Sequence, residues 1–377
     1  YDNCSGYNEL YKNHNVEPKD LQKINDFNFF PFVTKELIND NINDFTSSDK
    51  KLGRKTYYST GGSTGIQLGF YNTYEEICIE TAFSHSGWER VGWKINDKIA
   101  RLGGGYIGDI HNLFNYQPTT NEHHLSYYYL NDKTYSKYIK YLLKHKPKFL
   151  HSYPSAALSL SNLIIENNDI GSYSPSSILL GSENITDWQK KIIKKAFPSS
   201  KLFGWYGHTE KAVLAHWSEK KENYYIWPFY GYTEILKDNL DQSAFGYGEI
   251  IATSFWMKST PFIKYKTMDF GSLKRNDNSD KRNFDYFSFI DGRIQEFAIS
   301  STYRKISMTA INMHDDVFDD LKQFQFYQDK VGFLELKLVQ RNSSNSINLN
   351  KIKKLVKKKL GEDIELEITI VDNILAK

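Results

Sequence analysis

The sequence is short of cysteine, of long apolar runs and of any excess of one charge. Its 377 residues include two cysteines, too few for a disulfide framework or a cysteine-ligated zinc site. No stretch reaches the roughly 18–20 apolar residues that a membrane span needs, and no signal peptide is visible. Lysine plus arginine (48) nearly balance aspartate plus glutamate (45), so charge alone demands no nucleic-acid partner. These absences predict a cytoplasmic protein with no membrane span and no nucleic-acid ligand.

Aromatic residues, in contrast, are abundant. The chain has 27 Tyr, 24 Phe and 7 Trp, a composition that excludes disorder. With 23 Gly and 9 Pro, collagen-like and low-complexity classes are excluded as well. At about 150 residues per domain, the length corresponds to two or three domains' worth of chain.

The middle of the chain alternates between strand and helix patterns. Short apolar strands are expected at 148–153, 177–180 and 201–206, with helices near 134–146, from Pro154 onward and at 186–197. Capping boxes at Thr73-x-x-Glu76 and Thr186-x-x-Gln189 predict two helix starts, and Gly87 is expected to end the first of these helices. A strand, a helix and a strand in this spacing predict a parallel strand pair.

From residue 224 the pattern becomes β-rich. Strands are expected at 225–227, 232–236, 249–254 and 262–265, followed by a charged loop at 271–283. After Arg293 a smaller unit is expected, with strands at 324–328, 332–339 and 364–371 and a basic helix at 348–360. The lysines of this helix are expected to face solvent while its apolar residues pack inward.

One loop stands out because its residues cannot serve a core. Thr60-Gly61-Gly62-Ser63-Thr64-Gly65 lies between expected strands at 55–59 and 66–71. Glycine lets backbone N–H groups approach a ligand closely, and hydroxyl groups donate to phosphate oxygens. The lysine of a Walker loop is missing. The letters Gly61-x-Ser63-x-Gly65 also match a hydrolase nucleophile elbow, which needs a strand followed at once by a helix, so a serine esterase using Ser63 is an alternative.

Three further motifs carry polar groups at predicted strand ends or turns. Tyr206-Gly207-His208-Thr209-Glu210 follows a parallel strand, where open α/β sheets bind ligands, and its Glu can bind Mg²⁺. Tyr265-Lys266-Thr267-Met268-Asp269 places an Asp just after an expected strand, where it can accept hydrogen bonds from the vicinal hydroxyls of a ribose. Asp291-Gly292-Arg293 is expected to form a turn before the small unit, and its Arg suits a ribose or phosphate.

In their order and approximate spacing, these four motifs resemble those of the adenylate-forming (AMP-binding) ligase superfamily. The chain is most similar to the phenylacetate–CoA ligase-like branch and, within it, to the CapK-like proteins of capsular polysaccharide biosynthesis. Three other segments, 31–35, Gly181-Ser182-Glu183 and 324–328, resemble further parts of this branch. The resemblance therefore covers nearly the whole chain.

The resemblance implies an α/β fold in two unequal domains. A large N-terminal domain (1–292) is expected to hold mixed and parallel sheets with a β-rich subdomain, and a small α+β lid (293–377) is expected to be incomplete at its end. The sequence departs from the family pattern at Met268, where Gly is usual, at Gln67, where Pro is usual, and at the hinge position Gln295. A C-terminal Pro-x-x-x-x-Gly-Lys segment is missing, so its catalytic lysine either lies beyond Lys377 or does not exist.

The implied chemistry has two steps. A carboxylate attacks the α-phosphorus of ATP to give an acyl-adenylate and pyrophosphate, and a thiol or an amine then takes the acyl group. The implied cofactors are ATP and Mg²⁺, with coenzyme A as a candidate second substrate and an amino sugar among the candidate amines. The pathway implied is cell-surface polysaccharide biosynthesis.

The resemblance also implies a role for each motif. Thr209 and Glu210 would be catalytic, with Glu210 also the magnesium ligand, Tyr206 would lie against adenine, and Asp269 and Arg293 would fix the ribose. The acid would bind near Tyr153, Gly181 and Trp205. The complete set expected to bind nucleotide or acid is Ser59, Thr60, Gly61, Gly62, Ser63, Thr64, Gly65, Gly181, Ser182, Glu183, Trp205, Tyr206, Gly207, His208, Asp269 and Arg293. A non-catalytic nucleotide-binding protein is a second alternative, and the acid, the acceptor and the oligomeric state stay open.

Overall fold

A computed structural model describes residues 1–60, 68–103, 106, 111–127, 129–218, 220–237, 242–243, 245–276, 283–293, 297–303, 305–307, 321–340, 347–361 and 363–372. The chain divides into two compact units: Tyr1–Thr267 with Gly271–Ile290, and Met268–Phe270 with Asp291–Lys377. The expected α/β class is confirmed. The domain boundary between residues 292 and 293 stays a prediction.

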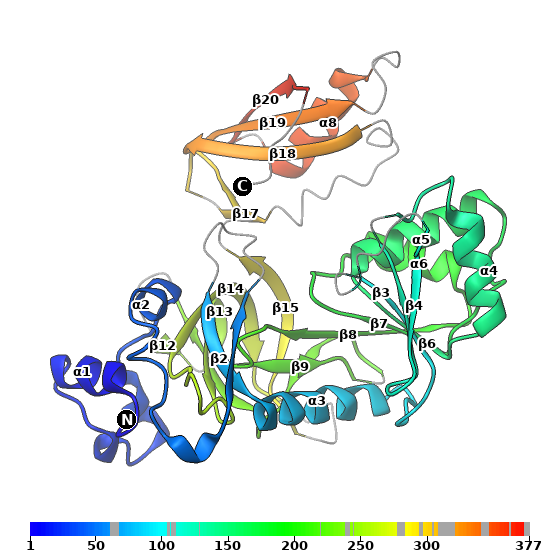
Figure 1. The fold of residues 1–377 in the computed structure, drawn as a ribbon. Coiled ribbons are helices and arrows are strands. Elements are labelled where there is room, and N and C mark those ends of the chain that lie inside the picture. The colour runs from blue at the N-terminus through cyan, green and yellow to red at the C-terminus, as the bar shows by residue number, and fades with distance from the viewer. Residues whose placement is uncertain are drawn as a thin grey trace. The chain divides into compact units, whose positions relative to one another are not determined.

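Parallel strands and helices alternate through the middle of the large unit (Figure 1). β3 pairs in parallel with β5 and β6, β6 with β7, and β7 with β8, while β4 is antiparallel to β5. The parallel pairing of β7 and β8, with α6 between them in the chain, confirms the prediction from the strand–helix–strand spacing. The elements are β3 (Ile99–Leu102), β4 (Phe114–Gln117), β5 (Glu122–Leu125), α4 (Tyr135–His145), β6 (Phe149–Ser152), α5 (Pro154–Glu166), β7 (Ser177–Leu180), α6 (Asp187–Ala196) and β8 (Lys201–Gly207).

The two faces of these parallel strands pack against different helices. Leu150 and Ile178 belong to the apolar cluster that also contains buried residues of α4, α5 and α6. Their strand neighbours Phe149 and Leu179 belong to another cluster, together with Trp88 of α3 (Tyr74–Glu89). Because successive strand residues point to opposite faces, helices cover both sides of the sheet, as parallel strands require.

β8 is shared between the parallel strands and an antiparallel region. Its first half, Lys201 to Gly204, pairs with β7, and its second half, Trp205 to Gly207, pairs with β9 in the opposite sense. The resulting 13-stranded sheet has the order β12-β11-β13-β14-β15-β10-β9-β8-β7-β6-β3-β5-β4. The antiparallel strands are β9 (Leu214–His216), β10 (Tyr224–Ile226), β11 (Gly231–Leu236), β12 (Gln242–Ser243), β13 (Gly246–Ser254), β14 (Tyr265–Lys274) and β15 (Tyr286–Arg293).

The strand predicted at 262–265 is wrong. β14 begins only at Tyr265, because Lys264 adopts a left-handed φ of 50° that interrupts an extended chain. Its backbone N–H donates to the Thr253 hydroxyl at 2.9 Å instead of entering a ladder. β14 also runs on to Lys274, so the loop expected from residue 271 begins later.

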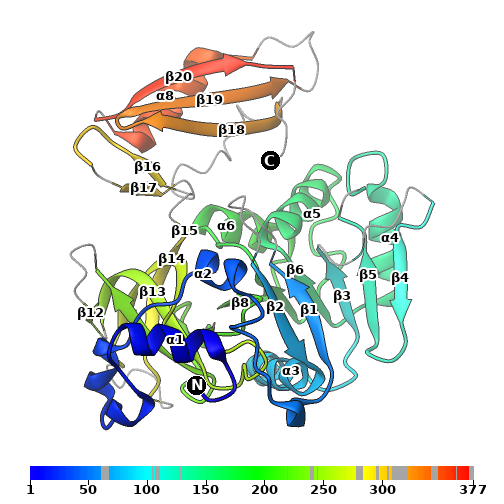
Figure 2. The same ribbon diagram turned by 60° about the vertical axis from the view of Figure 1, so that its left-hand side comes forward.

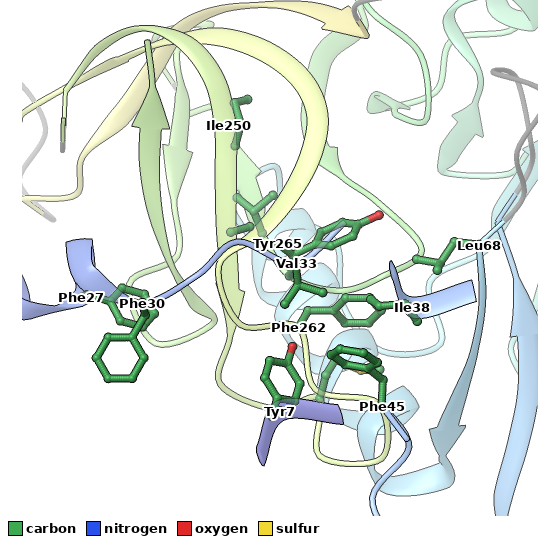
Figure 3. Packing of buried hydrophobic residues seen from close by; sticks show 14 of the residues in the cluster. Tyr7, Phe27, Phe30, Val33, Ile38, Phe45, Leu68, Ile250, Phe262 and Tyr265 are labelled. Carbon is green, nitrogen blue, oxygen red and sulfur yellow. The ribbon is translucent and has the colours of Figure 1, made fainter. Parts of the chain in front are cut away.

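The N-terminal segment packs against the antiparallel region through an aromatic core (Figure 3). The segment contains α1 (Ser5–Asn13), α2 (Lys35–Asp40) and three short 3-10 turns at Pro18–Asp20, Ile24–Phe29 and Lys50–Leu52. The Tyr7 ring lies edge-on to Phe45 with centroids 5.0 Å apart, and the Phe262 ring lies 5.0 Å from Tyr265. The Tyr7 hydroxyl donates to the Pro261 carbonyl at 2.8 Å, so the buried polar atom of this core residue is satisfied.

The small unit is an α+β structure with its own three-stranded sheet (Figure 2). β18 is antiparallel to β19, and β19 is parallel to β20. Ile352, Val356 and Leu360 of α8 are buried against the strands, and Lys353 and Lys354 are exposed, as expected. Lys357 is half-buried, because its ammonium donates to the carbonyl of Ile364. The elements are β16 (Phe297–Ile299), β17 (Lys305–Ser307), β18 (Leu321–Lys330), β19 (Phe333–Gln340), α8 (Leu349–Leu360) and β20 (Glu365–Ile370). None of the helices in the described part of the chain has the length and apolar character that crossing a bilayer requires.

The capping boxes at Thr73 and Thr186 are confirmed, but Gly87 does not end its helix. α3 continues to Glu89. A Cβ atom on Gly87 would lie 2.3 Å from the ring of His216, a fully buried side chain. Gly87 is therefore required for the close approach of a helix to a ring and not for a helix end.

Gly87→Ala is expected to destabilise the protein by about 1–3 kcal/mol, because the new methyl group must displace a packed ring. Alanine normally stabilises a helix interior by about 0.5–1 kcal/mol relative to glycine, so the expected sign is the reverse of the usual one. Urea unfolding measures the difference. Thr81→Ala, an exposed position of the same helix, is the control and should be close to neutral. Equal stability of wild type and Gly87→Ala would contradict the packing argument.

Candidate functional site

The candidate site is built around a turn that follows β8. The backbone N–H of Lys211 donates to the carbonyl of His208 at 3.0 Å, which closes the turn with Glu210 inside it. Lys211 has a left-handed φ of 53°, a conformation in which non-glycine residues are uncommon. The turn thus holds Glu210 at the carboxyl end of a strand, the place where open α/β sheets bind ligands.

Glu210 is buried, with 2% of its surface exposed. Its Oε1 accepts a hydrogen bond of 2.9 Å from the Tyr265 hydroxyl, and its Oε2 lies 3.5 Å from Nδ1 of His208. Burial by itself raises the pKa of this carboxyl, but attraction to His208 and Lys35 and the bond from Tyr265 outweigh burial and lower the pKa below its usual value. The side chain is therefore a buried carboxylate that stays ionised at neutral pH.

One short backbone bridge between distant parts of the chain brings Lys35 and Tyr265 near Glu210. Val33 forms a parallel bridge with Tyr265: its N–H donates to the carbonyl of Lys264 at 3.0 Å, and its carbonyl accepts from the N–H of Lys266 at 2.9 Å. Thr34 then caps α2, whose first residue is the buried Lys35. The sequence did not predict a site role for either residue. Lys35 ends the segment 31–35, which was noted only for its resemblance to the ligase branch, and Tyr265 begins the motif in which only Asp269 was assigned a role.

The glycine-rich loop lies between two strands, as predicted, and these strands pair as a hairpin. The second strand, expected at 66–71, is Gly69–Thr73. β1 (Lys55–Ser59) pairs antiparallel with β2 (Gly69–Thr73), with Ser59 opposite Gly69. Thr60 closes the hairpin, because its N–H donates to the Leu68 carbonyl and its hydroxyl accepts from the Leu68 N–H, both at 3.0 Å. The rest of the predicted phosphate loop, Gly61, Gly62, Ser63, Thr64 and Gly65, lies outside the described residues. The esterase alternative finds no support, since a strand and not a helix follows the loop.

Two predicted acid-site residues come together at the ends of β7 and β8. A Cβ atom on Gly181 would lie 2.3 Å from the indole of Trp205, so only glycine leaves room for this ring. The indole also contacts His151 and Trp88, at centroid distances of 5.1 and 5.9 Å. Tyr206 faces the opposite side of the strand, where its ring lies 5.8 Å from Phe287.

The loop after β7 has a structural partner as well. Ser182 is exposed with a φ of 69°. Glu183 accepts hydrogen bonds from the backbone N–H and the hydroxyl of Ser155, at 2.9 and 2.8 Å. Ser155 lies in the first turn of α5, so Glu183 satisfies a helix N-terminus, a stabilising position for a carboxylate.

The two predicted ribose-binding residues lie within strands, which corrects two expectations. Asp269 is not just after a strand but inside β14 (Tyr265–Lys274), and Arg293 is the last residue of β15 and not part of a turn. The preceding residue Met268 has a left-handed φ of 63°, so this position has the conformation that explains why glycine is usual there. Asp269 and Arg293 both belong to the small unit.

The donor set fits a magnesium ion that is bound mainly by its nucleotide. Among the described residues no group of three or more His, Cys, Asp or Glu side chains could hold a metal. Glu210 Oε2 nevertheless accepts no side-chain hydrogen bond in the described part of the chain, and the carboxylate is charged. Mg²⁺ in nucleotide sites takes one or two protein carboxylates and completes its shell with phosphates and water, which is what a single carboxylate offers.

Comparison with known proteins gives one similar sequence and several similar folds. No known family model matches the chain. The chain is 26% identical to Protein CapK of Staphylococcus aureus, over 99% of this chain and 82% of that protein. It is similar to 2-hydroxyisobutyryl-CoA ligase in complex with 2-HIB-AMP, with a TM-score of 0.74 and 15% identity, over 100% of this chain and 84% of that one. It is also similar to ATP-bound MatB from Rhodopseudomonas palustris, with a TM-score of 0.57 and 13% identity, over 85% of this chain and 65% of that one.

At identities this low, the structural similarity shows the fold and does not show the activity. The structural likeness to 2-hydroxyisobutyryl-CoA ligase extends over the whole chain. The protein therefore has the fold of the adenylate-forming ligases and is similar in sequence to CapK.

Proposed function

We propose that the protein activates a carboxylic acid with ATP, giving an acyl-adenylate and pyrophosphate. The observation that supports this most directly is the buried, ionised Glu210 just after β8. The next residue, Lys211, contacts both strands of the hairpin that flanks the glycine-rich loop. Similar folds are seen with acyl-adenylates or ATP bound, as in 2-hydroxyisobutyryl-CoA ligase and MatB. Phosphoryl transfer needs positioning and charge neutralisation more than covalent help from the protein.

Glu210 is proposed to hold the magnesium ion of MgATP through its Oε2. When bound, the ion neutralises charge on the phosphates while the acid attacks. Tyr265 keeps the carboxylate in place through its bond to Oε1, and Lys35 and His208 keep it ionised. Thr209 would contribute its hydroxyl beside the reacting groups, and the loop 60–65 would bind the phosphates with N–H and hydroxyl donors.

The remaining parts of the substrates are assigned on the same proposal. Tyr206 would lie against the adenine, and Asp269 and Arg293 would bind the ribose. The acid would lie beside Trp205 and Gly181, at the ends of the strands on the opposite side of β8 from Tyr206. A thiol such as that of coenzyme A is the proposed acceptor, with an amine, for example on an amino sugar, as the alternative.

The biological setting we propose is cell-surface polysaccharide assembly. The sequence similarity to CapK supports this setting, and the fold does not bear on it, because one fold can host many functions. The cytoplasmic location and the requirement for Mg²⁺ stay predictions.

Incubation of the protein with MgATP and a library of carboxylic acids is expected to release pyrophosphate with at least one acid. The same acid should support exchange of labelled pyrophosphate into ATP, because adenylation is reversible while the adenylate stays bound. Omitting the acid or chelating the magnesium is expected to abolish both signals. The acid that gives the strongest exchange identifies the substrate.

Two controls separate this proposal from the alternatives. A fluorophosphonate probe should leave Ser63 unlabelled, since labelling of Ser63 would indicate an esterase. Tight MgATP binding with no exchange for any acid would indicate a nucleotide-binding protein without catalysis and would overturn the proposal.

A further inference from the structure

Lys211 occupies a backbone conformation that favours a different residue. Its φ of 53° lies in the left-handed region, which is sterically unfavourable for a residue with a Cβ atom. Glycine would close the same turn without this cost. A lysine at this position indicates that its side chain contributes something that glycine cannot supply.

The side chain of Lys211 contacts both strands of the hairpin β1–β2. Its Nζ lies 5.7 Å from the ring centroid of Tyr58 in β1 and 5.7 Å from that of Phe70 in β2. The same ammonium donates a hydrogen bond of 3.2 Å to the carbonyl of Thr209. One cation thus joins the turn that carries Glu210 to the two strands that carry the glycine-rich loop.

The hairpin depends on such side-chain contacts. In the described part of the chain, β1 and β2 form a two-stranded sheet separate from the 13-stranded one, and an isolated hairpin of this kind is marginally stable in water. Two contacts of β2 hold the hairpin to the rest of the large unit. The N–H of Tyr71 donates to the Thr260 hydroxyl at 3.0 Å, and the Phe70 ring lies 5.6 Å from the Phe262 ring. These contacts fix the hairpin to the core but not to the Glu210 turn.

Three carboxylates, those of Glu80, Glu76 and Glu210, attract the ammonium of Lys211. Glu80 and Glu76 belong to α3, and each is held by other groups: Glu80 by the hydroxyl of Tyr230, and Glu76 by the N–H groups of Lys258 and Ser259 at 2.7 and 2.8 Å. These acids are therefore fixed in place around the Lys211 side chain.

We propose that Lys211 is a positioning residue that holds the hairpin β1–β2 against the Glu210 turn, so that the strand ends on either side of the glycine-rich loop keep a fixed spacing from the magnesium-binding carboxylate. This inference depends on the proposed function for its kinetic consequence, but not for its structural one. Lys211 itself need not touch the nucleotide. Loss of the contact would loosen the alignment of two groups that bind the same phosphates, and MgATP binding would suffer more than acid binding.

Lys211→Met keeps the aliphatic stem and removes the charge. The KM for MgATP is expected to rise by about tenfold, in line with the loss of two partly buried cation–π contacts, while the KM for the acid and kcat change little. Lys211→Arg should restore most of the affinity, because Arg also binds aromatic faces. Lys211→Gly relieves the left-handed strain but should raise KM as much as Lys211→Met, which separates the contact from backbone strain.

Lys190→Met is the matched control. Its Nζ also lies 5.7 Å from an aromatic centroid, that of Trp217, and it pairs with Asp187 and Glu222, but it lies in α6. Its removal should leave the KM for MgATP unchanged. Equal KM values for MgATP in wild type and Lys211→Met, or an equal rise in the KM for every substrate, would overturn the inference.

Hydrogen exchange tests the inference independently of activity. The amides of β1 and β2 are expected to exchange faster in Lys211→Met than in wild type, and to be unchanged in Lys190→Met. Unaltered protection of the hairpin would overturn the positioning role even if catalysis is found. Faster exchange in a protein that catalyses no pyrophosphate exchange would support the positioning role while the proposed function fails.

Discussion

Glu210→Gln is expected to lower the rate of acid-dependent ATP–pyrophosphate exchange by about 100- to 1,000-fold, the loss typical when one charge-stabilising group of a reaction is removed. The substitution replaces the carboxylate proposed to bind magnesium with a neutral amide of nearly the same shape. The amide oxygen can still accept the hydrogen bond from Tyr265. The fold should therefore keep its stability while the phosphates lose their ion.

The measurement compares exchange rates at saturating MgATP and acid, together with thermal stability. Glu249→Gln is the matched control, because Glu249 is another largely buried carboxylate and lies 3.2 Å from the ammonium of Lys266, outside the proposed machinery. Raising the magnesium concentration should recover part of the Glu210→Gln activity. An unchanged exchange rate in a folded Glu210→Gln protein would exclude the assigned role of Glu210.

Lys264→Met is expected to lower the free energy of unfolding by about 3–5 kcal/mol, the cost of leaving a buried charge without its partner. Lys264 is fully buried. Its Nζ donates to the carbonyl of Phe27 at 2.9 Å and lies 3.5 Å from Oε1 of Glu234. The same Nζ lies 5.1 Å from the ring centroid of Phe27 and 4.8 Å from that of Phe32. Without it, a carbonyl and a carboxylate are both left in an apolar setting.

Urea unfolding of Lys264→Met, Glu234→Gln and the double variant tests this argument as a double-mutant cycle. The double variant should be more stable than Lys264→Met, because it no longer buries an unpaired carboxylate. Lys258→Met, at an exposed position of the same region, should change stability by less than about 0.5 kcal/mol. Additive effects of the two single substitutions would show that Lys264 and Glu234 act independently.

Local patterns predicted much of the fold. Both capping boxes begin helices at the expected residues, and β1 and β7 have the predicted bounds. The capping boxes depend on side chains within four residues of one another, so the local sequence contains their whole cause. The two strands were predicted from their local patterns, although they pair with residues elsewhere in the chain. The position of Glu210 just after β8 follows equally from the alternation of strands and helices, although the last three residues of β8 pair antiparallel with β9.

The surroundings of Glu210 could not be predicted in the same way. Lys35 and Tyr265 are 230 residues apart in the sequence. The bridge between Val33 and Tyr265 brings both near Glu210, where Tyr265 donates a hydrogen bond and Lys35 attracts the carboxylate. No periodicity encodes such a contact. The prediction that Gly87 ends its helix was wrong for a related reason. Its partner, His216, lies on a strand far along the chain, so the sequence around Gly87 does not show why a glycine is needed there.

The pairing of β8 has a consequence for how the large unit comes apart. Four of its residues belong to the parallel ladder and the next three to the antiparallel one, with no linker between them. Neither region can lose its share of the strand without fraying the other, so the two should melt together in one cooperative transition, in spite of their different architectures. The end of this strand, which leads into the candidate catalytic turn, is therefore expected to open only when the large unit unfolds.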